Sequence, residues 1–194
     1  MAQTQAPSGW SGSLQYGYAI EMLDVISNEL TKKPKHGDII SIEAGYRFKN
    51  GWYLGAYLGK SRVKYNHRDD PDSDPFNLFS GRKDMLVAQT YGVSCGRDFR
   101  LGKRSLFNLG FTGIFLAELD SEVHYDIING DLQFLSRNQI WYDLGILLNF
   151  SYYYKINDNF HLGLKLTSMN CMVYFLQYTY LTPSLRFVIP GKSK

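Results

Sequence analysis

Three aspartates at alternate positions, Asp70, Asp72 and Asp74, lie in the densest acidic run of this 194-residue chain, His67–Pro75. Carboxylate oxygens at such spacing could bind Ca²⁺, a hard cation that prefers oxygen ligands. The segment lacks the glycine and the terminal glutamate that an EF-hand loop requires. A solvated loop is therefore the favoured interpretation and a calcium site the alternative. We predict no cofactor.

Histidine is the side chain best suited to acid–base catalysis near neutral pH, and the chain contains four. His36, His67 and His124 fall in segments expected to be long connections, and His161 falls on the polar side of an expected strand, near a short turn. A catalytic histidine needs a nucleophile or an orienting carboxylate within hydrogen-bond reach. The sequence offers no convincing partner beside any of the four, so we predict no enzymatic activity.

Seven charged residues share one property: each falls on the more polar side of a segment in which apolar and polar residues alternate. They are Glu21, Glu43, Arg47, Glu118, Asp143, Lys165 and Arg186. If that side faces an enclosed interior, the charges must be paired or hydrogen-bonded, because isolated buried charges are costly. We expect an internal network of salt bridges. A narrow or gated ion path is the alternative, and a proton relay is a third.

Eight alternating segments must position these residues. In the clearest, Gln139–Tyr154, every second residue from Ile140 to Tyr154 is apolar, which is the period of a β-strand with one apolar face. The expected strands are about Trp10–Leu23, Asp38–Phe48, Trp52–Tyr65, Lys83–Phe99, Ser105–Leu119, Gln139–Tyr154, Phe160–Ser168 and Tyr178–Ile189.

The connections alternate between short and long. The short ones include Asn50-Gly51, a strong hairpin signal, Arg100–Arg104 and Asn157–Asn159. The long ones are Asp24–Gly37, Asn66–Arg82, Asp120–Asn138 and Met169–Gln177, the last being either loop or strand extension. This rhythm predicts an antiparallel, up-and-down arrangement with all short turns at one end.

Composition agrees with an all-β chain of one domain. Tyr (15), Phe (12) and Gly (18) are abundant, and a net charge of +3 is too small to indicate nucleic-acid binding. We expect a flexible segment at residues 1–9, a single β-barrel domain at residues 10–189 and a tail at residues 190–194. The polar start could follow a removed export signal or be a disordered N-terminus.

Either face of such strands could be the outer one. A soluble barrel, such as a lipocalin-like carrier, turns its apolar face inward, whereas a transmembrane barrel turns it toward lipid. The polar faces here are rich in small residues, aromatic residues flank the short turns, and long loops gather at one end. These features favour an eight-stranded antiparallel transmembrane β-barrel of the bacterial outer membrane, with both termini in the periplasm.

Lys60, Arg62 and Lys64 continue the outward face of the third expected strand beyond its apolar part. Cations at this level could contact lipopolysaccharide phosphates just above the hydrocarbon layer. A solvated strand extension that protrudes from the membrane is the alternative.

The whole pattern resembles the OmpA/OmpX-type eight-stranded outer-membrane barrels. The last strand, with Tyr180, Leu185 and Phe187, is similar to the terminal strand that such proteins present to the barrel-assembly machinery, although here the chain continues through 188–194. The resemblance implies a non-enzymatic barrel whose external loops mediate adhesion, surface interaction or docking to a protein partner in an outer-membrane complex. A small channel for ions or hydrophobic solutes is the alternative, and the relevant enzymes would be lipid A-modifying enzymes or outer-membrane proteases.

Overall fold

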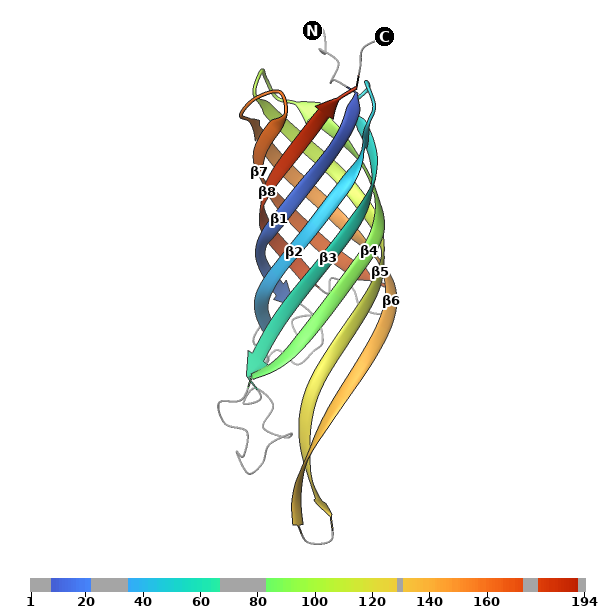
Figure 1. The fold of residues 1–194 in the computed structure, drawn as a ribbon, viewed down its shortest axis with the longest axis vertical. Coiled ribbons are helices and arrows are strands. Elements are labelled where there is room, and N and C mark those ends of the chain that lie inside the picture. The colour runs from blue at the N-terminus through green and yellow to red at the C-terminus, as the bar shows by residue number, and fades with distance from the viewer. Residues whose placement is uncertain (1–7, 22–34, 67–82, 129–130, 173–177, 192–194) are drawn as a thin grey trace.

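The described residues form eight antiparallel strands that close into a barrel. The computed structural model describes residues 8–21, 35–66, 83–128, 131–172 and 178–191. The strands are β1 (Gly9–Glu21), β2 (Lys35–Arg47), β3 (Trp52–Asn66), β4 (Lys83–Arg100), β5 (Ser105–Ile128), β6 (Asp131–Lys155), β7 (Phe160–Cys171) and β8 (Tyr178–Pro190). Each strand pairs with the next, and β1 pairs with β8 to close the sheet (Figure 1). The predicted all-β, up-and-down barrel is confirmed.

The strand faces follow the predicted alternation, and the apolar face is the outer one. Exposed apolar side chains cover the barrel wall on every strand, among them Leu14, Ile42, Leu54, Leu58, Val93, Phe111, Leu144, Ile146, Leu164 and Leu185. Their neighbours along the strands point inward and are buried, among them Gln15, Ser41, Ser94, Thr112, Asn149, Thr182 and Ser184. The interior is therefore built from the more polar half of each strand, and the lipophilic half lies outside.

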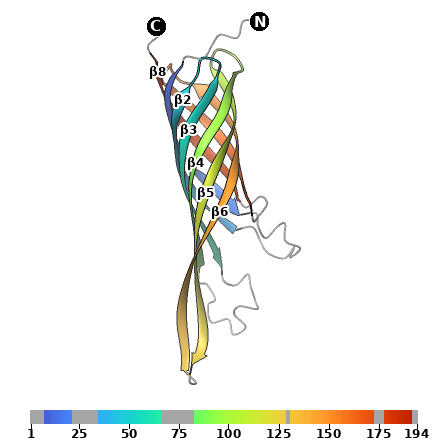
Figure 2. The ribbon, with the colours of Figure 1, turned by 90° about the vertical axis from the view of Figure 1, so that its right-hand side faces the viewer.

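The segment Asp120–Asn138, expected to be a long connection, is instead mostly strand. Strands β5 and β6 stay paired from Asp120↔Gln139 to Ile128↔Asp131, and this hairpin extends well past the rest of the barrel (Figure 2). Residues within it alternate in hydropathy, and the intervening sequence is Asn-Gly, a dipeptide typical of two-residue hairpin turns. The pairing of β5 and β6 therefore continues well beyond the strand ends that were predicted from the sequence.

Trp141 lies on the face of β6 opposite the apolar residues from Ile140 to Tyr154, which the alternation assigns to the interior, yet it is 60% exposed. The reason is that β6 pairs with β7 only as far as Gly145↔Cys171, so that beyond this level β6 has β5 alone as a described neighbour. A side chain on the inner face of a two-stranded ribbon has no lumen to enter. The alternation persists, but it no longer separates an interior from an exterior.

The turn between β2 and β3 shows why a short connection can be predicted from the sequence. Phe48 N–H donates to the Trp52 carbonyl at 2.8 Å, which leaves Lys49, Asn50 and Gly51 as the loop. Gly51 has a φ of 86°, a left-handed conformation that favours glycine. Both termini of the barrel lie at the end that carries the short turns (Figure 1). Among the described residues, no helix is long and apolar enough to cross a membrane.

Candidate functional site: the barrel lumen and the outer cation row

A compact group of charges fills the lumen near the short turns. Arg47 on β2 and Arg186 on β8 both reach Asp98 on β4; Arg47 forms an ion pair with this carboxylate, and Arg186 Nη1 lies 3.3 Å from Asp98 Oδ2. Asn108 donates a further hydrogen bond of 2.7 Å to Asp98 Oδ1. These charged side chains are almost fully buried, and the Asp98 carboxylate thereby links β2, β4 and β8 within the lumen.

Asp98 was missed by sequence reasoning. On β4, two steps of the strand period beyond the inward-facing Ser94 place Gly96 and Asp98 on the inner face. Asp98 pairs in register with Asn108, which is itself an inner-face residue. The signal was therefore present in the sequence, four residues beyond Ser94.

A second ion pair lies one step further into the lumen. Lys165 Nζ on β7 donates to Glu43 Oε2 on β2 at 3.1 Å, and the lysine side chain is 3% exposed. Aromatic rings line this level: Lys165 lies 5.6 Å from the centre of the Tyr57 ring, and the Arg186 guanidinium lies 3.7 Å from that of Tyr153. Cation–π contacts of this kind stabilise desolvated cations.

Small residues make room for these rings. Gly96 and Gly110 pair across β4 and β5, and a Cβ atom built on Gly96 would lie 2.5 Å from a ring carbon of Tyr53. A Cβ atom on Gly110 would lie 2.6 Å from the Tyr53 hydroxyl. These small inner-face residues on β4 and β5 therefore make room for the Tyr53 ring from the neighbouring strand β3.

Toward the long-loop end the lumen changes character and becomes apolar. A layer of buried side chains closes it: Ile39, Tyr57, Val63, Leu86, Ala88, Ile114, Leu116, Leu147, Met169, Tyr178 and Tyr180. A ladder of hydrogen bonds between Ser94, Thr112, Asn149 and Thr167 joins β4 to β7 inside the barrel. The interior thus has a charged layer near the turns and an apolar layer near the loops, whereas a polar lumen throughout was expected.

This packing leaves almost no free path. The cavity beside Ser13, Glu43, Arg47 and Lys165 has a volume of only about 10 Å³. That is at the lower bound of the space that one water molecule requires. The lumen at this level is therefore largely filled by the described side chains.

The other predicted lumen charges lie elsewhere. Glu118 and Asp143 occupy half-buried positions toward the loop end of β5 and β6, and Asp143 Oδ1 accepts a hydrogen bond of 2.7 Å from the Leu144 amide. Glu118 is ten residues beyond Asn108 on β5, roughly 33 Å at the rise of a strand. Glu21 ends β1, and its side chain lies outside the described residues. Of the seven predicted charges, the structure brings together Glu43, Arg47, Lys165 and Arg186.

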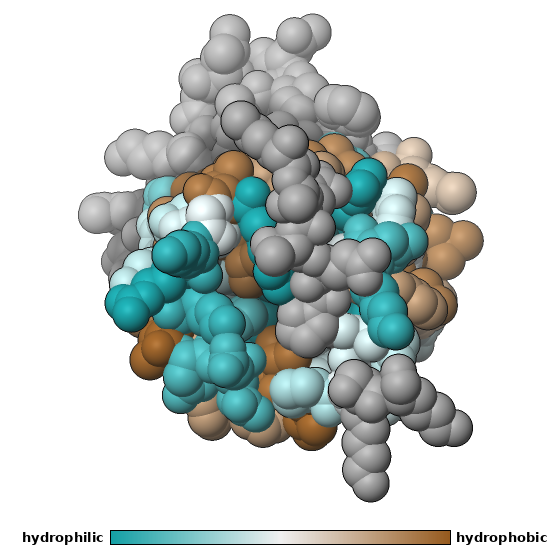
Figure 3. Space-filling model, turned by 90° about the horizontal axis from the view of Figure 1, so that it is seen from above, coloured by the Kyte–Doolittle hydropathy of each residue, from teal (hydrophilic) through white to brown (hydrophobic). Residues whose placement is uncertain are grey.

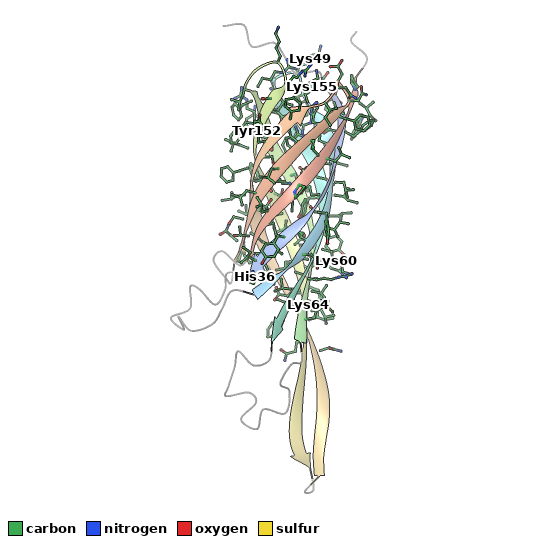
Figure 4. The ribbon with its side chains drawn as sticks, turned by 90° about the vertical axis from the view of Figure 1, so that its left-hand side faces the viewer. His36, Lys49, Lys60, Lys64, Tyr152 and Lys155 are labelled. Atoms are coloured by element: carbon green, nitrogen blue, oxygen red, sulfur yellow. The ribbon has the colours of Figure 1, made fainter. Side chains whose placement is uncertain are left out.

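Lys60, Arg62 and Lys64 form a row on the outer face of β3, here called the outer cation row. They pair in register with Ile40, Asp38 and His36 on β2, and Lys60 and Lys64 lie near the loop end of the barrel wall (Figure 4). On the same strand Val63 points inward and is 1% exposed. The outer face of β3 therefore changes along the strand, from apolar at Leu54 and Leu58 in the middle to cationic toward the loop end.

The histidines do not assemble a catalytic site within the described part of the chain. His36, expected in a loop, lies on β2, is exposed and stacks on Tyr18 with ring centres 5.5 Å apart. His124 lies on β5, with its side chain outside the described residues, as is the whole of His67. His161 points inward as predicted.

The predicted calcium ligands Asp70, Asp72 and Asp74 lie outside the described residues. Within the described ranges, no group of three or more His, Cys, Asp or Glu side chains is arranged to hold a metal ion.

Comparison with solved structures supplies the fold family. No protein-family model matches the chain, and no curated protein matches it in sequence. Neisserial surface protein A (NspA) shares 15% identity and superposes with a TM-score of 0.58, covering 94% of this chain and 99% of its own. The chain has the OmpA/OmpX-type outer-membrane barrel fold.

Two further barrels of the OmpA/OmpX type overlap less closely. The N-terminal β-barrel domain of Pseudomonas aeruginosa OprF is 11% identical, with a TM-score of 0.47 over 93% of this chain and 98% of its own. The attachment invasion locus protein Ail of Yersinia pestis, solved with the heparin analogue sucrose octasulfate, is 15% identical, with a TM-score of 0.45 over 92% and 99%. At these identities the likeness concerns fold alone.

Proposed function

We propose that this chain is a non-enzymatic integral barrel of the bacterial outer membrane that anchors external segments and does not conduct ions. The observation that carries the proposal is the outer surface. Exposed large apolar side chains occur on all eight strands, a far greater contiguous apolar area than soluble monomers leave in water. Lipid is the environment in which such a wall is stable.

Aromatic side chains gather at both ends of this apolar wall. Near the short turns Trp10, Phe48, Trp52, Tyr152, Tyr154 and Phe160 are exposed. Nearer the loops Tyr18, Tyr91, Phe115 and Tyr142 are exposed. Rings at two levels are the arrangement expected where an apolar band meets two membrane–water interfaces. The termini and short turns would then face the periplasm, as the short-turn end does in such barrels.

The change from apolar to cationic residues on the outer face of β3 supports a boundary for the apolar band. Toward the loop end Lys60, Arg62 and Lys64 lie outside while Val63 and Leu86 are buried inside. That arrangement is the one a soluble barrel uses. The chain would therefore rise beyond the hydrocarbon layer as a short water-exposed barrel with its own apolar core.

Membrane insertion is tested by folding. The refolded chain should migrate differently on a gel before and after heating and should need detergent or lipid to remain monodisperse. A folded, monodisperse monomer in detergent-free buffer would remove the membrane assignment and restore the soluble carrier.

We propose that the outer cation row contacts lipopolysaccharide phosphates. Three cations at successive outward positions of β3, directly above the apolar part of the strand, match the level of these phosphates. The double variant Lys60→Gln/Lys64→Gln should lose part of the thermal stabilisation that added lipopolysaccharide gives the refolded chain. Lys49→Gln is the matched control, because Lys49 is an exposed lysine at the opposite end of the barrel (Figure 4). Equal losses in both variants would refute a specific contact.

The external segments are the proposed site of surface interaction or docking. The β5–β6 hairpin supports this role, because it extends from the barrel beyond the ends of its neighbours (Figure 1). Chemical crosslinking on native outer membranes should give a discrete product with the full chain. Removing residues 122–137 should abolish that product while heat-dependent gel migration is retained, and persistence of the product would exclude the hairpin.

A further inference from the structure

We propose that the turn end of the barrel carries a binding site for a tetrahedral oxyanion, either inorganic phosphate or the phosphoryl group of a lipid headgroup. The site is a cavity of about 80 Å³ beneath the β4–β5 and β6–β7 turns. It is separate from the outer cation row, which lies at the other end of the barrel (Figure 4).

Cations dominate the lining of this cavity. Six basic side chains border it, Arg47, Arg100, Lys103, Arg104, Lys155 and Arg186, together with two carboxylates, Asp98 and Asp158. Asp98 is already held by two arginines, and Asp158 is paired with Lys155. The remaining cations have no carboxylate of their own within the lining. An end-on view shows hydrophilic residues over much of this end, with apolar residues along parts of its edge (Figure 3).

The buried charges beneath the cavity do not balance. The lumen cluster contains three cations, Arg47, Lys165 and Arg186, against two carboxylates, Glu43 and Asp98. An uncompensated buried charge is expensive, and a bound anion is one way to neutralise it. Arg47 and Arg186 belong both to this cluster and to the cavity wall, so an anion in the cavity would meet the excess charge directly.

His161 supplies an independent indication. Its side chain borders the cavity and is only 7% exposed, yet Nδ1 is buried and has no hydrogen-bond partner among the described residues. In register, His161 lies between Lys155 on β6 and Arg186 on β8. An imidazole N–H placed between two cations can donate to an anion that both cations attract.

The chemistry favours a phosphate-like ligand. Arginine guanidinium groups present several N–H donors and bind phosphate oxygens bidentately, and lysine adds a mobile charge. A cavity of about 80 Å³ is several times the space that one water molecule requires, so it admits a group larger than water. Its opening at the periplasmic end would give access to free phosphate and to lipid headgroups of the inner leaflet.

The test uses the full chain refolded in n-dodecyl maltoside, a detergent without phosphate. Titration with inorganic phosphate at constant ionic strength should show saturable binding by calorimetry. Lys103→Gln/Arg104→Gln should weaken the affinity about tenfold, because two charge-assisted contacts are lost. Lys49→Gln, which removes an exposed turn-end cation outside the cavity, should change it less than about twofold. No saturable binding, or equal losses in both variants, would overturn the proposal.

Two further experiments test the role of His161 and identify the source of the phosphoryl group. His161→Phe should weaken phosphate binding as well; if this buried substitution prevents folding, judged by heat-dependent gel migration, the exposed-residue pair decides the question. Titration with a short-chain phosphatidylglycerol below its micelle concentration separates the sources. Tighter binding of the lipid, with phosphate competing, assigns a headgroup; binding of phosphate alone assigns the free ion. Displacement of phosphate by equimolar chloride would show simple charge attraction and reject the site.

Discussion

Lys165 on β7 donates a 3.1 Å hydrogen bond to Glu43 on β2, joining two strands that share no edge. Sheet hydrogen bonds fix each strand only to its two neighbours, whereas this pair spans the lumen. Because the Lys165 ammonium group is buried and has lost its hydration, the Glu43 carboxylate is the main group that compensates its charge. The ion pair is therefore an internal brace: it links β2 and β7, two separate parts of the barrel wall, through the lumen.

Removing one partner should be more damaging than removing both. Lys165→Met leaves Glu43 buried without its cation and should lower the free energy of unfolding by about 3–5 kcal/mol. Glu43→Gln/Lys165→Met should recover part of that loss. Urea titrations in lipid vesicles measure both. Lys155→Met, at an exposed ion pair in a turn, should leave the unfolding midpoint almost unchanged; a loss as large as that of Lys165→Met would contradict the internal brace.

The barrel should not conduct, even when the charged layer is broken. The apolar layer of Leu116, Leu147, Met169, Tyr178 and Tyr180 is a second obstruction that contains no salt bridge. Planar-bilayer recordings of the wild type and of Lys165→Met should both lack stable unitary currents. Currents in Lys165→Met alone would show that the ion pair is the gate, and currents in the wild type would restore the channel hypothesis.

A charge introduced on the outer wall should destabilise the barrel to different degrees at different positions of one strand. Val93 and Gln89 are both exposed on the same face of β4, but Val93 pairs with Ala56 in the apolar band and Gln89 pairs with Lys60 at its edge. Val93→Arg should lower the free energy of unfolding in vesicles by about 2–4 kcal/mol, and Gln89→Arg by about 0–1 kcal/mol. Equal effects would show that the wall does not lie across a bilayer.

The β6–β7 turn provides a pH-dependent contact at the turn end of the barrel. The hydrogen bond from Lys155, with its positive charge, lowers the pKa of Asp158 below the ordinary carboxyl value. A lowered folded-state pKa means that the contribution to stability is present above the ordinary pKa and is lost as pH falls through the lowered one. ¹³C NMR titration of Asp158 should find this lowered pKa, and Lys155→Gln should return it toward the ordinary value. An unchanged midpoint in that variant would exclude Lys155 as the cause.

The sequence was sufficient for the features that depend on period and local turn chemistry. Alternation assigned the faces of β7 and β8, and Asn50-Gly51 marked a turn whose glycine adopts φ of 86°. The extent of β5 and β6 was underestimated, because a long polar stretch was interpreted as loop although the Asn-Gly pair at its centre signals a hairpin.

The lumen was harder to predict than the wall. Ile39, Val63, Leu116 and Leu147 are apolar residues on the inner face, where polar residues were expected, and only the packing of opposite walls shows that they meet. Which charged side chains form ion pairs also depends on the three-dimensional fold. Glu43 and Lys165 are 122 positions apart, and no local spacing indicates that they touch. Asp98 differs, since continuing the alternation by two steps would have found it.

The seam between β1 and β8 has a consequence for the order of assembly. Gly9 pairs with Pro190, so this contact closes a loop of nearly the whole chain, the type of contact that slows folding most. Until β8 pairs with β1, the open sheet has two unpaired edges, each able to add a strand from another molecule. Closure of this seam therefore competes with self-association, and faster pairing of β8 with β1 favours the closed monomer over an aggregate.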